Sequence, residues 1–193
     1  MLKTSKKLIL ASSSPRRKQI LENLNLSFAI RKIDFDESYP KGLPPEEVPI
    51  FISKQKVKQL PKIEANELYI TSDTVVVLEG KVIEKPKDKL DALVMLKSLS
   101  GKTHQVITGV CLTSSDDQFS FKEVTEVTFH SLSEQEITYY IDNYYPLDKA
   151  GAYGIQEWIG LIGIKEIKGN YDNVVGLPAS TLFQKMKQLN LFE

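Results

Sequence analysis

Hydrophobic and polar positions follow two different periods along this chain. Apolar runs rich in β-branched residues predict strands at 8–11, 27–33, 68–78, 105–113, 119–129 and 158–167. Apolar positions at helical spacing predict helices that begin after Ser14, Pro44, Asp88, Ser133 and Val175-Gly176-Leu177. Strands and helices alternate, but turns at 79–81 and 114–118 join neighbouring strands as hairpins. We therefore expect an α/β fold with a mixed β-sheet and flanking helices.

Three of these helices have recognisable first turns. Ser14 precedes Pro15, which suits an N-cap followed by proline at the first helical position. Ser133 and Glu136 have the spacing of a capping box. The helix after Pro44 can extend to about residue 60, provided that Pro49 falls in its first turn.

Length and charge narrow the class of protein. The 193 residues suit one domain, or one domain with two lobes, and 41% hydrophobic with 26% charged residues indicate a globular chain. The 25 Lys and Arg residues balance 25 Asp and Glu residues, so the net charge is zero. Nucleic-acid-binding domains usually carry a basic excess, and we expect no nucleic-acid partner.

The cysteine count and the apolar runs indicate the compartment. Cys111 is the only cysteine, which excludes an intrachain disulfide and a Cys-rich zinc site and predicts a buried structural thiol. The run at 8–11 is too short for a signal sequence, and no run is long enough to span a bilayer. We expect a cytoplasmic protein with no membrane contact.

The segment 12–17, Ser-Ser-Ser-Pro-Arg-Arg, is the first candidate for chemistry. Backbone N–H groups after Ser14 are free at a helix N-terminus, where the helix dipole favours an anion. Arg16 and Arg17 in the first turn oppose that dipole at about 0.3–1 kcal/mol each, and their forked donors suit phosphate oxygens. A capped helix with solvated arginines is the alternative, and the segment alone leaves both open.

Asp73 is the second candidate, because it interrupts the apolar run 68–78. A carboxylate there is costly unless it is paired or ligated, and such groups bind cations or accept a proton from water. An Asp in a strand-breaking turn is the alternative. Asp36-Glu37 could supply a further carboxylate, although an exposed loop pair is the simpler interpretation of that dipeptide alone.

Other segments carry weaker signals. Lys85 lies in a Glu-Lys-Pro-Lys loop, and Lys56 lies on an amphipathic helix whose lysines should mostly face water. Gly151 and Gly154 suggest close backbone approach to a ligand or a strand, with a structural turn as the alternative. We interpret both histidines, Trp158 and the tyrosines at 139, 140, 144 and 145 as structural or subunit-contact residues.

Taken together, these motifs resemble the Maf family, the septum-formation-related nucleotide pyrophosphatases. The resemblance runs from Leu8 to about Leu189. It rests on segments 10–17, 36–37, 72–76, 84–86, 99–101, 148–156 and 175–178, together with Lys56. It implies a single domain over 1–193 with two lobes around a central cleft, related to the inosine-triphosphate pyrophosphatases.

The resemblance also implies an activity, namely hydrolysis of a nucleoside triphosphate to the monophosphate and pyrophosphate. The segment 148–156 resembles the branch acting on dTTP and UTP, and the 7-methylguanosine triphosphate branch is the near alternative. The family's activity implies removal of wrong nucleotides and a link to cell-division arrest. A non-catalytic, nucleotide-sensing regulator of septum formation is the competing class. A homodimer is also implied.

Roles follow for individual residues. Asp73 is expected to be the general base, and Glu37 and Asp73 to hold a divalent cation, Mg²⁺ or Mn²⁺. The residues expected to bind substrate are Ser14, Arg16, Arg17, Lys56, Thr74, Lys85 and Gln156. Of these, Arg17, Thr74 and Gln156 occupy the positions that track base choice in the family. Glu157-Trp158 departs from the pattern, in which a small residue would be expected after Gln156.

Overall fold

The computed structural model describes residues 2–33 and 35–192. Its strands are β1 (Lys7–Leu10), β2 (Phe28–Ile30), β3 (Glu67–Leu78), β4 (Lys81–Ile83), β5 (Thr103–Thr113), β6 (Gln118–Phe129) and β7 (Ile164–Lys168). Its α-helices are α1 (Pro15–Asn23), α2 (Val48–Val57), α3 (Lys89–Leu99), α4 (Glu134–Tyr144), α5 (Trp158–Gly163), α6 (Tyr171–Val175) and α7 (Ala179–Gln188). Short 3₁₀ turns occupy Pro45–Glu47, Pro146–Asp148 and Ala150–Ala152.

The strands form one mixed seven-stranded sheet in the order β2-β1-β3-β5-β6-β7, with β4 on β3. The pairs β1–β2 and β1–β3 are parallel, whereas β3–β4 and β6–β7 are antiparallel. The predicted α/β class with a mixed sheet is therefore confirmed. The chain divides into two compact units. Unit 1 comprises Met1–Thr74, Thr108–Glu123 and Gly176–Glu193, and unit 2 comprises Val75–Ile107 and Val124–Val175.

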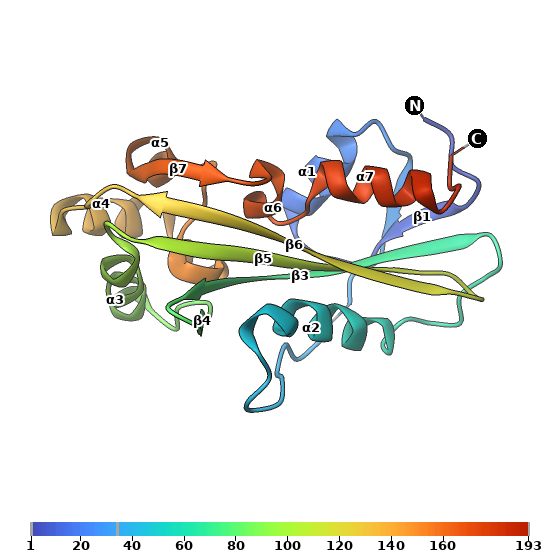
Figure 1. Ribbon diagram of the computed structural model, residues 1–193, viewed down its shortest axis with the longest axis horizontal. Coiled ribbons are helices and arrows are strands. Elements are labelled where there is room, and N and C mark those ends of the chain that lie inside the picture. The colour runs from blue at the N-terminus through green and yellow to red at the C-terminus, as the bar shows by residue number, and fades with distance from the viewer. Residues whose placement is uncertain (1, 34, 193) are drawn as a thin grey trace. The chain divides into compact units, whose positions relative to one another are not determined.

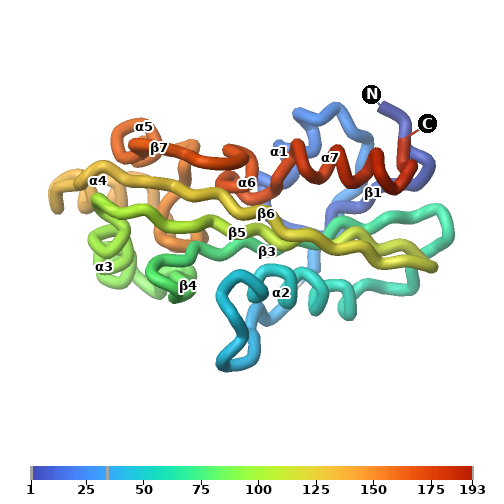
Figure 2. Tube along the Cα trace, viewed as in Figure 1, coloured from blue at the N-terminus to red at the C-terminus, as the bar shows by residue number. Residues whose placement is uncertain are grey.

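In unit 1, helices cover both faces of the strands. Helices α1 and α7 lie on one face and α2 lies on the other (Figures 1 and 2). Alternation along β1 explains this arrangement, since Leu8 and Leu10 point to one side while Ile9 packs with Tyr69 on the other. The predicted cap of α1 is present, with Ser14 as N-cap and Pro15 in the first turn. Pro49 lies in the first turn of α2, as a helix there requires.

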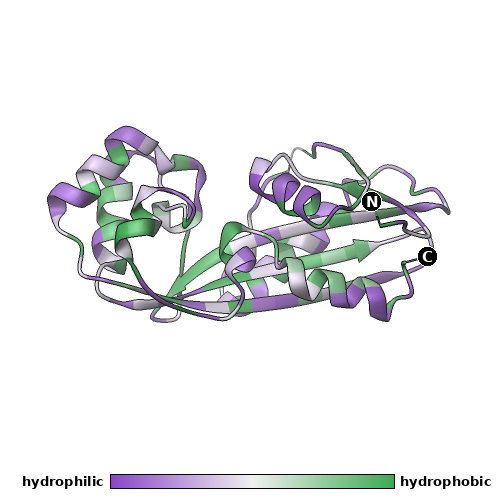
Figure 3. Cartoon of the chain, turned by 90° about the horizontal axis from the view of Figure 1, so that it is seen from above, coloured by the Kyte–Doolittle hydropathy of each residue, from purple (hydrophilic) through white to green (hydrophobic). Residues whose placement is uncertain are grey.

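In unit 2, α3 packs against α4, and α5 contacts both α4 and β7. The buried face of α4 carries Ile137, Tyr140 and Ile141 at helical spacing, and its start has the predicted capping box. Figure 3, in which green marks apolar residues, shows the apolar and polar sides of these helices. His104 is buried, and its Nε2 lies 2.8 Å from the Tyr153 hydroxyl. Burial lowers the pKa of His104 to about 4, so the ring is neutral, as a structural role requires.

Two predicted strands are wrong in extent or kind. Residues 158–167 were expected to form one strand, but 158–163 form helix α5 and only Ile164–Lys168 form β7. The buried positions Ile159 and Gly163 are four residues apart, which is helical spacing that a short apolar run conceals. The strand expected at 27–33 is limited to Phe28–Ile30. None of the helices in residues 2–33 and 35–192 is long and apolar enough to cross a membrane.

Gly109 on β5 sets how closely α2 approaches the sheet. A Cβ atom built there would lie 2.4 Å from the backbone nitrogen of Ile50 and 2.5 Å from the Pro49 carbonyl oxygen. Only a residue without a side chain fits at that separation, because the obstacle is the backbone of the helix.

The substitution Gly109→Ala is therefore expected to lower the free energy of unfolding by about 2 kcal/mol, as overpacking does. Urea unfolding followed by circular dichroism measures this change. Gly163→Ala is the control, since its Cβ would meet the side chains of Leu132 and Ile159 at 3.3 Å or more and should cost less. Equal stability of the two variants would contradict a backbone clash at Gly109.

Candidate active site

Lys56 gathers two carboxylates in unit 1. It lies in the last turn of α2 and is 8% exposed. Its Nζ lies 2.9 Å from Asp73 Oδ1, 3.0 Å from Glu37 Oε1 and 3.2 Å from the carbonyl oxygen of Ser72. The structure thus gives the buried Asp73 its partner, and the alternative of a strand-breaking turn is wrong because Asp73 lies within β3.

Burial controls the electrostatics of Asp73, which is 6% exposed. Loss of hydration raises the pKa of the Asp73 carboxyl, whereas Lys56 and Arg17 act to lower it and Glu37 acts to raise it. The net direction is upward. A carboxylate with a raised pKa is a better proton acceptor than an exposed one, which is the property that a general base needs.

Arg17 forms a second cluster, on helix α1. Its guanidinium donates to the carbonyl oxygens of Gly176 and Ser72, both at 2.9 Å, and to Thr74 Oγ1 at 3.2 Å. A longer contact of 3.4 Å reaches Ser12 Oγ. Burial lowers the pKa of Arg17, and Asp73 and Glu37 oppose that shift. Since the carbonyl of Ser72 accepts from both Arg17 and Lys56, the two clusters share one acceptor.

Thr74 is held from two sides. Its hydroxyl lies 2.9 Å from Thr108 Oγ1 on β5 and accepts from Arg17. Ser14 caps α1 by accepting from the Arg17 backbone N–H at 3.4 Å, so the capping role predicted for Ser14 is confirmed.

Five of the predicted site residues therefore meet in unit 1: Glu37, Lys56, Asp73, Arg17 and Thr74. Ser14 and Arg16 belong to the same unit, at the start of α1. Lys85 and Gln156 belong to unit 2, and both side chains are exposed.

Sequence reasoning missed several contacts that shape this site. Thr108 bonds to Thr74, and the Gly176 carbonyl accepts from Arg17. A threonine in a β-rich run and a main-chain carbonyl carry no sequence signal of their own. Gly176 could have been suspected, because it lies in the Val-Gly-Leu-Pro segment that carries the family resemblance.

The two carboxylates suit a divalent cation. Asp73 and Glu37 both bond to the Lys56 ammonium group, so two carboxylate oxygens lie close together. Among residues 2–33 and 35–192, no group of three or more His, Cys, Asp and Glu side chains could hold a metal. Mg²⁺ is typically bound by one or two carboxylates, with substrate phosphates and water completing its coordination shell. Asp73 and Glu37 match that set of protein ligands.

Comparisons with known proteins identify related sequences. A family model described as Maf-like protein matches residues 7–189. A protein of Bacteroides fragilis named dTTP/UTP pyrophosphatase is 51% identical over 185 residues, covering 95% of this chain and 96% of that protein. Proteins of the same name from Bacteroides thetaiotaomicron and Flavobacterium psychrophilum are 50% and 48% identical. They cover 94% and 92% of this chain and 95% and 91% of their own lengths, respectively.

One solved structure bears on the fold. A HAM1 protein from Coxiella burnetii superposes with a TM-score of 0.50 at 12% identity. The match covers 95% of this chain and 99% of that one. At such low identity the likeness concerns the fold alone, and it agrees with the α/β architecture described above.

Proposed function

The chain belongs to the Maf-like protein family, and on this basis we propose that it hydrolyses dTTP and UTP to the nucleoside monophosphate and pyrophosphate. The single observation that carries the proposal is the buried Asp73, which lies beside Lys56 and Glu37 with its pKa raised by burial. The choice of dTTP and UTP as substrates rests on the relatives that are named dTTP/UTP pyrophosphatase.

In the proposed mechanism, Asp73 orients a water molecule and accepts its proton as the water attacks the α-phosphorus. The bond from that phosphorus to the bridging oxygen breaks, and pyrophosphate leaves. A bound Mg²⁺ or Mn²⁺, held by Asp73 and Glu37, would offset the charge on the phosphates. No covalent intermediate is needed.

Cationic groups are proposed to hold the triphosphate. Lys56 and Arg16, with the N–H groups after Ser14, provide positive charge in unit 1. Lys85 and Gln156 keep the roles implied by the family resemblance, which are phosphate binding and base recognition. We also propose a cytoplasmic homodimer that binds no nucleic acid, and sedimentation of the purified protein tests the subunit count.

Purified protein with dTTP and excess Mg²⁺ or Mn²⁺ is expected to release pyrophosphate and dTMP. Orthophosphate should appear only after inorganic pyrophosphatase is added, because the α–β bond is the one cleaved. Chelation with EDTA should stop the reaction. Nucleotide that binds but stays intact with every divalent cation would contradict hydrolysis and support a nucleotide-sensing regulator.

A further inference from the structure

The segment that carries Gln156 is a tight turn within unit 2. The Glu157 N–H donates to the Gly154 carbonyl oxygen at 3.0 Å, and the Gly160 N–H donates to the Glu157 carbonyl oxygen at 2.9 Å. Residues 151–155 are buried, whereas Gln156 is exposed. The turn therefore presents one polar side chain from an otherwise buried segment.

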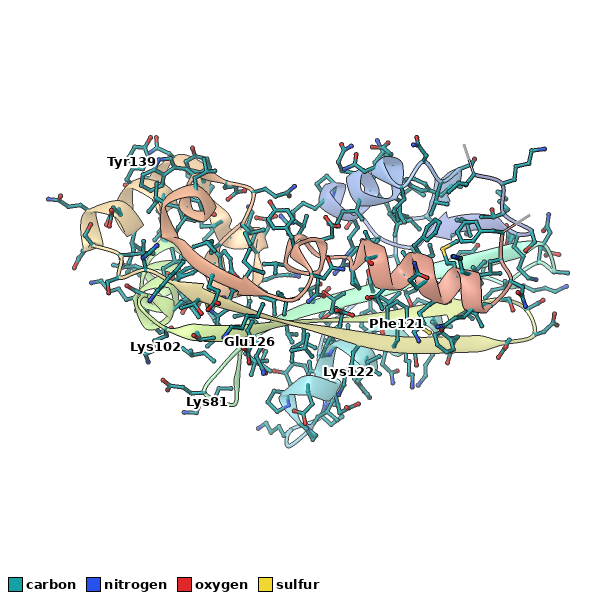
Figure 4. The ribbon with its side chains drawn as sticks, turned by 45° about the horizontal axis from the view of Figure 1, so that its top comes forward. Lys81, Lys102, Phe121, Lys122, Glu126 and Tyr139 are labelled. Carbon is teal, nitrogen blue, oxygen red and sulfur yellow. The ribbon has the colours of Figure 1, made fainter. Side chains whose placement is uncertain are left out.

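Tyr140 on α4 joins the two ends of this turn. Its hydroxyl accepts from the Gly154 N–H at 3.0 Å and donates to a carboxylate oxygen of Glu157. The neighbouring Tyr139, labelled in Figure 4, is 49% exposed and contacts Trp158 edge-to-face at 4.8 Å, while Tyr140 is fully buried. Burial and Glu157 both raise the pKa of Tyr140, so its hydroxyl keeps the proton that it donates.

Lys149 completes this group. It is 7% exposed, and its Nζ lies 3.0 Å from Glu157 Oε1 and 2.8 Å from Asp148 Oδ1. A buried ammonium needs such partners, because an unpaired charge there would be strongly destabilising. The Glu157 carboxylate is thus held by a cation on one oxygen and by the Tyr140 hydroxyl on the other.

Gly154 makes room for the Glu157 side chain. A Cβ atom built at Gly154 would lie 2.8 Å from the Glu157 carboxyl carbon. The glycine therefore allows the carboxylate to fold back over the turn instead of extending into water. The family resemblance implies a small residue at position 157, so this carboxylate is a departure from that pattern.

We propose that Tyr140, Glu157 and Lys149 are positioning residues that hold Gln156 in the orientation needed to recognise the base. This inference rests on the proposed function and deepens it. The Tyr140 hydroxyl bonds to Gly154 before Gln156 and to Glu157 after it, and Lys149 bonds to Glu157. None of the three side chains needs to touch the nucleotide. A side chain held in one orientation loses less conformational entropy when it binds, so its hydrogen bonds contribute more to affinity.

Two substitutions remove these contacts with little change of shape. Tyr140→Phe deletes the bridging hydroxyl but keeps the ring that stacks on Tyr144. Glu157→Gln keeps the side-chain length but removes the charge that pairs with Lys149. Tyr153→Phe is the matched control, since it deletes a buried hydroxyl that bonds to His104 and leaves the bridge across the turn intact.

The experiment measures kcat and KM for dTTP and CTP, and amide hydrogen exchange at Gly154 and Glu157. In Tyr140→Phe and Glu157→Gln, we expect KM for dTTP to rise about tenfold with kcat nearly unchanged, which is the effect of one weakened polar contact. The preference for dTTP over CTP should fall, and both amides should exchange faster without substrate. Tyr153→Phe should leave the preference and both amides unchanged.

A double variant separates positioning from general damage. If Tyr140 acts through Gln156, then Tyr140→Phe combined with Gln156→Ala should be no less selective than Gln156→Ala alone. If the double variant loses more selectivity than Gln156→Ala, the inference is overturned. It is also overturned if Gln156→Ala loses the preference for dTTP over CTP while Tyr140→Phe and Glu157→Gln keep the wild-type preference. Wild-type protein that hydrolyses no dTTP would instead overturn the proposed function, and the positioning role with it.

Discussion

Replacing Asp73 with Asn is expected to lower kcat for dTTP hydrolysis by about 10²-fold or more. The amide has nearly the same shape but cannot accept the proton of the attacking water, and it is a poor ligand for a divalent cation. The fold should survive. The Asn side chain fills the same buried position, and Glu37 remains 3.0 Å from the Lys56 ammonium to balance its charge. Steady-state pyrophosphate release measures the loss, with circular dichroism to verify folding.

A carboxylate outside the site provides the matched control. Glu47 pairs with Lys122 of β6 at 2.5 Å, and Lys122 is labelled in Figure 4. Both belong to unit 1, and the pair is partly exposed, so Glu47→Gln removes a charge of the same kind without touching Asp73. Its kcat should stay within about twofold of wild type. Near-normal turnover by a folded Asp73→Asn protein would eliminate Asp73 as the general base.

The chemistry of Asp73 could be predicted because a charge inside an apolar strand has few explanations. Its partner could not be identified in the same way. Lys54, Lys56 and Lys58 lie on one short segment, and only Lys56 is buried. That distinction depends on how α2 packs on the sheet, which it approaches closely at Gly109 of β5. Such packing is a property of the assembled fold, which local periodicity does not encode.

The capping residues were predictable for the opposite reason. Ser14 and Ser133 each accept a hydrogen bond from a backbone N–H within the first turn of the helix, so donor and acceptor lie close together in the sequence. Tyr140 shows which contacts local sequence does not predict. Its place among buried residues follows from helical spacing, but its hydroxyl meets Gly154 fourteen positions further along the chain. The strand prediction for 158–163 was wrong for a similar reason, because a short apolar run with two glycines is compatible with a strand or a helix.

Base choice is the second large effect, and we expect dTTP and UTP to be hydrolysed in preference to CTP by about 10²-fold in kcat/KM. The carboxamide of Gln156 can both donate and accept. The 4-amino group of cytosine replaces an acceptor with a donor, which would leave a polar group of the site unpaired at about 1–3 kcal/mol. Purine triphosphates should be poorer substrates again.

Gln156→Glu should lower kcat/KM for dTTP, because it removes the amide donor and adds a negative charge near a polyanionic substrate. Stability should change little, since Gln156 is exposed. Gln135→Glu is the matched control: it makes the same change at another exposed position of unit 2, in the first turn of α4. The measurement is kcat/KM for dTTP, UTP, CTP and 7-methyl-GTP under one set of conditions. A clear lead for 7-methyl-GTP would assign this chain to the other branch of the family, because a site that favours a methylated purine cannot depend on a pyrimidine edge paired with Gln156.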